Sequence, residues 1–415
     1  MPSMNEQRET GPNQTGPTDG WTEFLARETA AIREGGLWRN LDHLASAPGP
    51  AVQVDGQELV QCCSNNYLGL ASDRRLVAAA QTAAAHFGVG TGGSRFLGGS
   101  HVLHRQLEDR LSRLKGHEDC VLFSSGYLAN VGTLSALLRP GDTVFSDRLN
   151  HASIIDGCRL SGARIVVYPH RDVKTLTGML RTAQGQKLIV SDTIFSMDGD
   201  EAPLAELAQR AAEFGALLMV DEAHATGVLG PGLTVRHGLG GQVPLVMGTC
   251  SKALGSVGGF VVGHRMLCDY VRQRARTFVF DTSLPPPCVA ATLAALEVIE
   301  QEPKRGERAC LLSRRLWENL VQLGFAAMPP DAAIVPVIFG PTNVALEAAK
   351  QLRRLGVLAT AVRPPTVPAG TARIRLCTMA THTDEHIERI VSAFAQLPTE
   401  LRCLAQSCVD AQANG

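Results

Sequence analysis

The chain has 415 residues, of which 45% are hydrophobic and 19% charged, and its formal net charge at pH 7 is −1. This composition is typical of a globular protein with two or three domains, and the charge offers no basic excess for nucleic acid or anionic lipid. No apolar run approaches the ~18 residues that span a bilayer, and no signal peptide is apparent. We therefore expect a cytoplasmic protein without a membrane or nucleic-acid partner.

The 11 cysteines are scattered along the chain, and no C-x-x-C pair occurs. Most lie in apolar runs, as Cys120 does in DCVLF and Cys377 in RLCTM. This pattern is typical of buried free thiols in a reducing compartment. We expect neither a disulfide framework nor a metal site.

The start of the chain predicts a tail and an arm. Residues 1–20 are polar and rich in Gly, Pro, Asn and Gln, so we expect a disordered tail. A helix is predicted from about Trp21 to Arg33, and the Asp-Gly turn in VQVDGQEL predicts a hairpin of two short strands. Residues 21–60 thus form a predicted N-terminal arm.

Residues 61–302 alternate between helical and strand patterns. Two helices are predicted first, over LVAAAQTAAAHF and HVLHRQLEDRLSRLKG. Seven short β-rich runs follow, at 120–124, 143–146, 164–168, 187–191, 216–220, 244–248 and 259–263. Several are continuously apolar, which is typical of strands covered on both faces of a sheet. We predict a large α/β domain with a mainly parallel seven-stranded sheet.

A helix over about 287–301 and a charged break, QEPKRGER, end the large domain. Residues 303–403 then show a helix, a strand at AIVPVIF, a helix at NVALEAAKQLRRLG, strands at VLATAV and ARIRLCT, and a helix at THTDEHIERIVSAFAQL. This order predicts a small C-terminal α+β domain. Residues 404–415 are expected to form a frayed tail.

Asp221 and His224 follow the apolar run ALLMV, at the end of a predicted strand. Ligands of open α/β sheets bind at the carboxyl ends of strands. A carboxylate there would keep a pyridine nitrogen protonated, which makes the ring an electron sink, and the histidine could bind a ring substituent. A helix N-cap and a structural histidine would explain the same two residues.

Lys252 lies in GTCSKALGSVGG, at the end of the next apolar strand. A positioned lysine amine forms an imine with an aldehyde, and the glycines allow a ligand close to the backbone. Thr249 could contact a phosphate oxygen. The rival interpretation is a phosphate-binding loop, but the G-x-x-x-x-G-K-[ST] spacing is missing.

Polar residues also follow three other predicted strands. The segment SSGYLAN (124–130) opens a helix whose free N–H groups suit a phosphate, or makes an ordinary turn. His151 could stack on an aromatic ring or cap a helix. Asp192 and Ser196 either reach the pocket or form a turn. Together these residues place anion-binding, acidic, stacking and amine groups at the edge of one sheet.

These motifs resemble those of the α-oxoamine synthase family of fold-type I pyridoxal-phosphate enzymes. The matching motifs are SNNYLGL (64–70), GTGGSR (90–95), FSSGYLAN (123–130), DRLNHASIIDG (147–157), FSMDGD (195–200), VDEAHATGVLG (220–230), GTCSKALGSVGG (248–259) and TSLPP (282–286). The resemblance implies the fold-type I transferase fold and pyridoxal 5'-phosphate as the cofactor. It also implies a homodimer with the active site at the subunit interface.

The resemblance implies a role for individual residues. It makes Lys252 the Schiff-base lysine, Asp221 the partner of the pyridine nitrogen and His224 the partner of the phenolic oxygen. The other implied cofactor contacts are Gly126, Tyr127, a stacking His151, Ser196, Thr249 and Thr282, the last at the partner subunit's cofactor phosphate. The implied substrate contacts are Arg39, Asn65, His151, Arg363, Thr366 and the carboxylate clamp Arg375.

The implied reaction is a decarboxylative condensation of an amino acid with an acyl thioester, in which Lys252, His151 and Asp221 are catalytic. RPPTVPAGTARIR (363–375) and FSMDGDEAPL are similar to a subgroup that joins L-alanine to pimeloyl-CoA in biotin synthesis. Glycine C-acetyltransferase, aminolevulinate synthesis and the use of an acyl-carrier protein are alternatives. A cofactor-free subunit is another, although such a chain should have lost the lysine.

Overall fold

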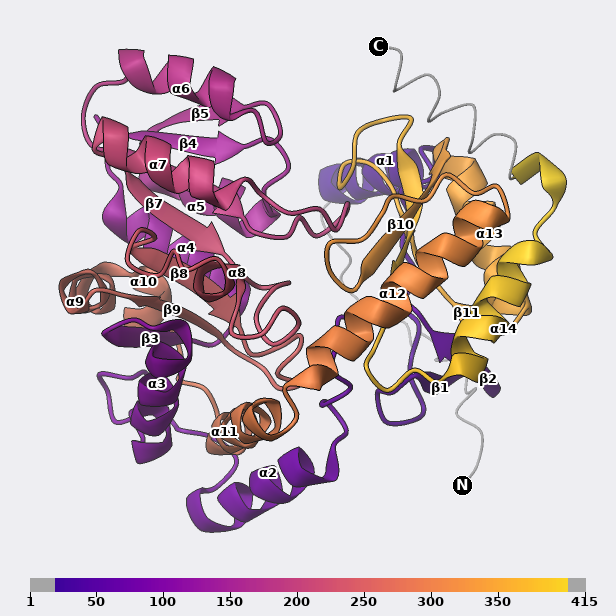
Figure 1. Cartoon of the computed structure of the whole chain (residues 1–415), viewed down its shortest axis with the longest axis horizontal. Helices are drawn as coiled ribbons and strands as arrows, with labels where there is room; N and C mark the ends of the chain where they lie inside the picture. The colour runs from indigo at the N-terminus through magenta and orange to yellow at the C-terminus, as the bar shows by residue number, and fades with distance from the viewer. Residues whose placement is uncertain (1–18, 402–415) are drawn as a thin grey trace.

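The computed structural model describes residues 19–401, which form two lobes (Figure 1). Residues 1–18 of the predicted N-terminal tail and the predicted tail at 404–415 lie outside the described residues. The predicted N-terminal tail is wrong at its last two positions, because helix α1 (Asp19–Glu34) already includes them. Asp19 is an acidic residue in the first turn, where it interacts favourably with the helix dipole.

The large lobe contains a seven-stranded sheet in the order β3-β9-β8-β7-β6-β4-β5. Its strands are β3 (Asp119–Phe123), β4 (Thr143–Asp147), β5 (Arg164–Tyr168), β6 (Lys187–Asp192), β7 (Leu217–Asp221), β8 (Leu245–Thr249) and β9 (Gly259–Gly263). Strands β4 to β8 pair in parallel, whereas β9 is antiparallel to both its neighbours. The predicted mainly parallel sheet is confirmed, and every residue of β3, β4, β8 and β9 is buried.

Helices cover both faces of this sheet. The helices of the large lobe are α2 (Arg74–Phe87), α3 (Val102–Lys115), α4 (Gly126–Leu137), α5 (Ala152–Ser161), α6 (Val173–Thr182), α7 (Leu204–Phe214), α8 (Leu233–Arg236), α9 (Arg265–Arg274), α10 (Arg276–Val279) and α11 (Pro286–Gln301), of which α2 packs on α11. Alternate strand residues enter different apolar clusters. Val121 belongs to the cluster that includes residues of α4, α5 and α9, whereas Leu122 belongs to the one that includes residues of α3, α6, α7 and α11.

The small lobe packs a three-stranded sheet against helices. Its elements are α12 (Lys304–Gln322), β10 (Ile334–Gly340), α13 (Thr342–Arg354), β11 (Val357–Leu358), β12 (Ala361–Val362), β13 (Ala372–Cys377) and α14 (Asp384–Ala395). The single strand predicted at VLATAV is wrong, because β11 and β12 belong to different sheets. The predicted charged break is also too long, since α12 begins inside it at Lys304, directly after Pro303.

The N-terminal hairpin joins the small lobe. Strands β1 (Ala51–Val54) and β2 (Gln57–Gln61) pair antiparallel, which confirms the predicted hairpin. Its two turn residues, Asp55 and Gly56, both have positive φ angles, as the two-residue hairpin turn requires. Strand β2 pairs in parallel with β11, so Val60 is part of the apolar core of the small lobe.

Between Asp19 and Leu401, no helix is long and apolar enough to cross a membrane. The cysteines in this part of the chain are all free thiols. Within the same range, no group of three or more His, Cys, Asp or Glu residues is arranged to hold a metal ion.

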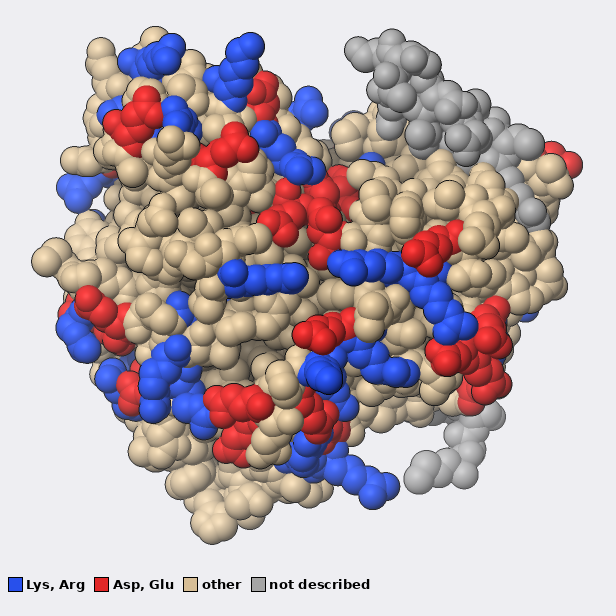
Figure 2. Space-filling model, viewed as in Figure 1, with Lys and Arg blue, Asp and Glu red and all other residues tan. Residues whose placement is uncertain are grey.

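A groove of about 760 Å³ lies between the lobes and is lined by residues of both, including Leu229, Arg236, Leu311 and Arg314. Acidic and basic side chains gather where the lobes meet (Figure 2). The lining also includes Glu201. The charges of this groove are therefore mixed, and they do not select a ligand of one sign.

An ion pair is fully buried beneath the turn that follows β7. Lys115, the last residue of α3, pairs with Glu222, and neither side chain is exposed. Lys115 Nζ also donates to Thr226 Oγ1 at 2.7 Å, and Glu222 Oε1 accepts from the Thr234 N–H at 2.7 Å. A Cβ atom at Gly232 would clash with both charged groups. The pair therefore holds the turn and its surroundings in one arrangement.

Removing the cation alone should strongly destabilise the protein. We predict that Lys115→Met lowers the free energy of unfolding by about 3–5 kcal/mol, because the Glu222 carboxylate is left buried without a counter-charge. Denaturant unfolding measures the change. The double variant Lys115→Met/Glu222→Gln keeps the acceptor for Thr234 but removes both charges, and it should recover most of the loss. A double variant no more stable than Lys115→Met would contradict this account.

Candidate active site

The predicted cofactor residues meet where the parallel strands of the large lobe end. The register of β6 and β7 places Asp192 directly opposite Asp221. Strand β8 ends at Thr249, just before Lys252. In Figure 1 the arrow of β7 points toward the small lobe. The strand ends therefore face the region between the lobes.

Lys252 and His224 are in direct contact, with Nζ of the lysine 2.8 Å from Nε2 of the histidine. The pKa of Lys252 is lowered to about 8, mainly by burial. The negative charge of Asp221 opposes this shift, and the positive charge of Arg375 adds to it. Burial also depresses the pKa of His224 well below its ordinary value, so its imidazole is neutral. A lysine amine with a pKa this close to physiological pH has a substantial neutral fraction, and the neutral form can attack an aldehyde.

The buried Asp221 carboxylate is held by two donors. Its Oδ1 atom accepts the Ala223 N–H at 2.8 Å, and its Oδ2 atom accepts from Asn130 Nδ2 at 2.7 Å. Asn130 Nδ2 also donates to Ser153 Oγ at 2.9 Å, and this hydroxyl lies 2.7 Å from His151 Nδ1. A chain of contacts thus connects the buried acid to the exposed ring of His151.

Asp192 positions His151 from the other side. Its Oδ2 atom accepts the backbone N–H of His151 at 2.8 Å. Burial, and then the neighbouring Asp221 charge, raise the pKa of Asp192 well above its usual range. Two adjacent buried carboxylates repel each other when both are ionised, so the site favours a proton on Asp192. The position of Asp192 at the end of a predicted strand was the only sequence signal that it would contact His151.

The start of α4 forms an anion cradle with the end of β8. Ser125 caps the helix by accepting the Leu128 N–H at 3.2 Å. The first N–H groups of a helix, here those of Gly126 and Tyr127, lack intrahelical partners and suit a phosphate. A Cβ atom at Gly126 would lie 3.3 Å from Thr249 Oγ1, so the glycine allows this hydroxyl to approach the helix start. The structure brings together three predicted phosphate contacts.

Arg375 reaches the site from β13 in the small lobe. Its side chain is buried, and its Nη1 atom donates to Asn65 Oδ1 at 3.0 Å. Nε donates to the backbone carbonyl of Ser196 in the large lobe. The planar fork of a guanidinium is suited to a carboxylate. The predicted clamp therefore lies with two other predicted site residues, Asn65 and Ser196.

Three buried residues of the site were not predicted. Tyr67 Oη lies 2.7 Å from His224 Nδ1, and Asn130 and Ser153 connect Asp221 with His151. Each lies inside a motif quoted from the sequence, which was the available signal. A tyrosine, asparagine or serine in an apolar segment is equally typical of a satisfied core residue.

Arg39, Arg363 and Thr366 form a second group. The Arg363 guanidinium donates to the backbone carbonyl of Trp38, and the Thr366 N–H donates to the carbonyl of Arg363 at 3.1 Å. Burial, and then the charge of Arg39, lower the pKa of Arg363, so the two cations lie near each other. No hydrogen bond within residues 19–401 joins this group to Lys252.

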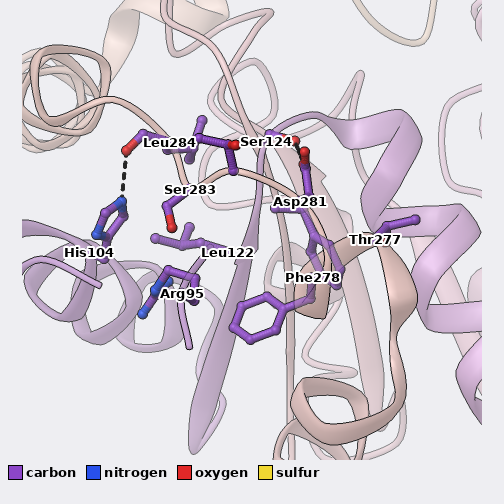
Figure 3. A pocket seen from close by; sticks show the side chains of 11 residues that line it. Arg95, His104, Leu122, Ser124, Thr277, Phe278, Asp281, Ser283 and Leu284 are labelled. Carbon is purple, nitrogen blue, oxygen red and sulfur yellow. Dashed lines mark hydrogen bonds between the residues drawn. The ribbon is translucent and has the colours of Figure 1, made fainter. Parts of the chain in front are cut away.

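Thr282 lies on a fixed segment and is exposed, whereas Ser283 and Leu284 beside it are buried. Asp281 accepts from the Ser124 hydroxyl, and the Leu284 carbonyl lies 2.9 Å from His104 Nε2 (Figure 3). The cavity beneath the segment measures about 10 Å³, which leaves room for no more than a water molecule. Thr282 lines this small cavity and is also exposed at the surface.

The residues present fit pyridoxal 5'-phosphate. The amine of Lys252 matches the aldehyde, the buried Asp221 carboxylate matches the pyridine nitrogen, and the neutral His224 ring matches the phenolic oxygen. The cradle at the start of α4 matches the phosphate. The fold and this donor set define the class of α/β enzymes that process amino acids with a lysine-bound pyridoxal phosphate.

Comparison with known proteins identifies the family. Residues 57–394 match the family model described as aminotransferase class I and II. The chain is 48% identical over 386 residues to 8-amino-7-oxononanoate synthase of Anaeromyxobacter dehalogenans, covering 92% of this chain and 97% of the relative. It is 45% identical to the synthase of Geobacter sulfurreducens, covering 92% and 99%. The chain belongs to the aminotransferase class I and II family and, within it, to the predicted α-oxoamine synthases.

Solved structures show the same fold. Serine palmitoyltransferase of Sphingomonas wittichii is 32% identical, with a TM-score of 0.85, and the match covers 95% of this chain and 98% of that chain. The 8-amino-7-oxononanoate synthase of Francisella tularensis is 24% identical, with a TM-score of 0.70, over 81% and 97%. The predicted fold-type I transferase fold is confirmed.

The lowered pKa of Lys252 predicts how the apoprotein captures its cofactor. The amine reacts only when neutral, so the rate of visible-band formation with added pyridoxal phosphate should rise with pH and level off above about 8. Stopped-flow absorbance across a pH series measures this rate. Lys350→Ala, which removes an exposed lysine on α13, is the control and should follow the same profile. A rate that rises only near pH 10 would contradict the prediction.

Proposed function

We propose that this protein is an 8-amino-7-oxononanoate synthase that uses pyridoxal 5'-phosphate. The reaction joins L-alanine to pimeloyl-CoA and yields 8-amino-7-oxononanoate, carbon dioxide and free CoA. The observation that carries the proposal is the 48% identity to a synthase of this name over 92% of the chain. The contact of Lys252 with His224, close to the buried Arg375, supplies the chemistry that such a reaction needs.

Each group of the site then has a task in this reaction. Bound pyridoxal phosphate supplies an electron sink for the α-carbon of the amino acid. Arg375 holds the amino acid carboxylate through its planar fork. Lys252, as a neutral amine, takes the α-proton as the general base. Asp221 would hold a proton on the pyridine nitrogen, and His224 would donate a hydrogen bond to the phenolic oxygen.

The exposed groups would receive the acyl thioester. His151 lies at the edge of the site with its backbone fixed by Asp192, so its ring can cover the cofactor and face the incoming thioester. Arg39 and Arg363 place two cations near each other, which suits an anionic part of the acyl donor. Thr366, on the same segment as Arg363, completes this proposed substrate contact.

A substrate panel tests the proposed reaction. We predict that L-alanine with pimeloyl-CoA, or with pimeloyl acyl-carrier protein, gives a product with the mass of 8-amino-7-oxononanoate. Glycine and serine with acetyl-CoA or palmitoyl-CoA should give little product. Lys252→Ala should lack both turnover and the visible cofactor band. Preferential turnover of glycine with acetyl-CoA would instead support glycine C-acetyltransferase activity.

We further propose a homodimer whose active sites lie at the interface. Four apolar side chains near the glycine-rich segment are largely exposed: Val89 (81%), Phe96 (53%), Leu97 (80%) and Phe280 (71%). The Ser283 N–H donates to the Gly93 carbonyl at 3.1 Å, so the segments that carry them are joined. Exposed apolar patches of this kind mark protein contacts. A second copy that covers the patch would bring the exposed Thr282 to the partner's cofactor phosphate.

A charge in this patch should break the dimer. We predict that Leu97→Asp converts the dimer to monomer in sedimentation velocity and weakens cofactor retention, because burying an unpaired carboxylate is costly. Met266→Asp, at an exposed apolar position on α9, is the matched control and should remain dimeric. A monomeric native protein, or a Leu97→Asp dimer as stable as the native one, would overturn the proposed interface.

A further inference from the structure

We propose that Tyr67 is a positioning residue that sets the tautomer of His224 and joins it to the Arg375 clamp. This inference rests on the proposed function, because it deepens the account of the same site. Tyr67 was not among the predicted site residues. Its hydroxyl connects the group that faces the cofactor with the group that faces the amino acid carboxylate.

The hydroxyl of Tyr67 has three polar neighbours and is buried. His224 Nδ1 lies 2.7 Å from it, Asn65 Oδ1 lies 3.0 Å from it, and Arg375 Nη2 donates to it at 3.0 Å. These partners come from the segment before α2, the turn after β7, and β13 of the small lobe. One oxygen atom therefore joins both lobes of the molecule inside the site.

The backbone of Tyr67 is also fixed. Its N–H donates to the Asn65 carbonyl at 2.8 Å, and its carbonyl accepts the Ala380 N–H at 2.7 Å. The Tyr67 and His224 rings pack edge to face, with their centroids 6.0 Å apart. The hydroxyl therefore has little freedom to leave its partners.

Counting protons indicates which atom of His224 carries hydrogen. A phenolic hydroxyl has one proton, and a guanidinium can only donate. The Tyr67 hydroxyl can donate its proton either to His224 Nδ1, at 2.7 Å, or to Asn65 Oδ1, at 3.0 Å. The contact with His224 is the shorter one, and Asn65 Oδ1 already accepts from Arg375 Nη1 at 3.0 Å. We therefore place the Tyr67 proton toward Nδ1. A neutral imidazole that accepts at Nδ1 carries its own hydrogen at Nε2.

This tautomer makes His224 a donor at Nε2, 2.8 Å from Lys252 Nζ, and it requires a neutral Lys252 amine, because an ammonium group could only donate to Nε2. The phenolic oxygen of pyridoxal phosphate is an acceptor, so a donor at Nε2 stabilises its anionic form. The opposite tautomer would present a lone pair to that oxygen. Tyr67 thus acts on the cofactor through His224, in the way that an outer residue fixes the tautomer of a metal-bound histidine. Arg375 shares the same hydroxyl, so the carboxylate clamp belongs to this network.

The variant Tyr67→Phe tests the proposal in the holoenzyme, because it removes only the hydroxyl. Without the Tyr67 hydroxyl, His224 is no longer fixed as a donor at Nε2 to the anionic oxygen of the cofactor. The pH midpoint of the visible cofactor band should therefore rise by about one unit. Tyr168→Phe, a buried tyrosine on β5, is the matched control and should leave the midpoint unchanged. The dissociation constant for alanine, followed through the same band without an acyl donor, should rise about tenfold in Tyr67→Phe, because Arg375 loses one partner. An unchanged midpoint would overturn the proposal.

A second measurement does not depend on the folding of the variant. In native holoenzyme labelled with ¹⁵N-histidine, His224 should show hydrogen on Nε2 and an unprotonated Nδ1. Hydrogen on Nδ1, with the Tyr67 hydroxyl turned to Asn65, would overturn the proposal. Neither experiment contains an acyl donor. A different product in the substrate panel would therefore contradict the proposed function without changing the assignment of Tyr67.

Discussion

Burial of the Lys252 amine among charged groups is the constraint on which the site depends. Desolvation disfavours the ammonium form, Asp221 favours it, and Arg375 opposes it, with the result that the pKa falls to about 8. A lysine in water, with a pKa near 10.4, would be almost entirely charged at neutral pH. The same amine can therefore serve first as a nucleophile and then as a base, because the fold holds it in a partly desolvated position.

The sheet and the small lobe create this balance together. Parallel pairing of β6 and β7 brings Asp192 and Asp221 to one edge, and β8 adds the segment with Lys252. Arg375 comes from a strand in another lobe and donates to the backbone of Ser196. The contacts of Arg375 with Ser196 and Tyr67 thus both join the lobes and build the site. A change in their relative placement would alter the charge near the lysine.

Much of the fold could be predicted because it follows from local patterns. Each strand of the large sheet is a short apolar run, and Lys252, Asp221 and His224 are recognisable because they follow such runs. VLATAV was misjudged because the pairing of β11 depends on Val60 of the distant hairpin. The charged break was judged too long because α12 buries Gly306 and Ala309 while its charged residues face outward. The role of Tyr67 depends on contacts with residues far along the chain, which a pattern of neighbours does not contain.

The covalent attachment of pyridoxal phosphate to Lys252 is the central claim, and it can be tested without any substrate. Borohydride reduces a carbon–nitrogen double bond between a lysine and the cofactor to a stable amine. Peptide mapping by mass spectrometry then locates the modified residue. The account predicts a single phosphopyridoxyl group on the peptide that contains Lys252. A group on another lysine, or an unmodified chain from protein with the visible band, would contradict it.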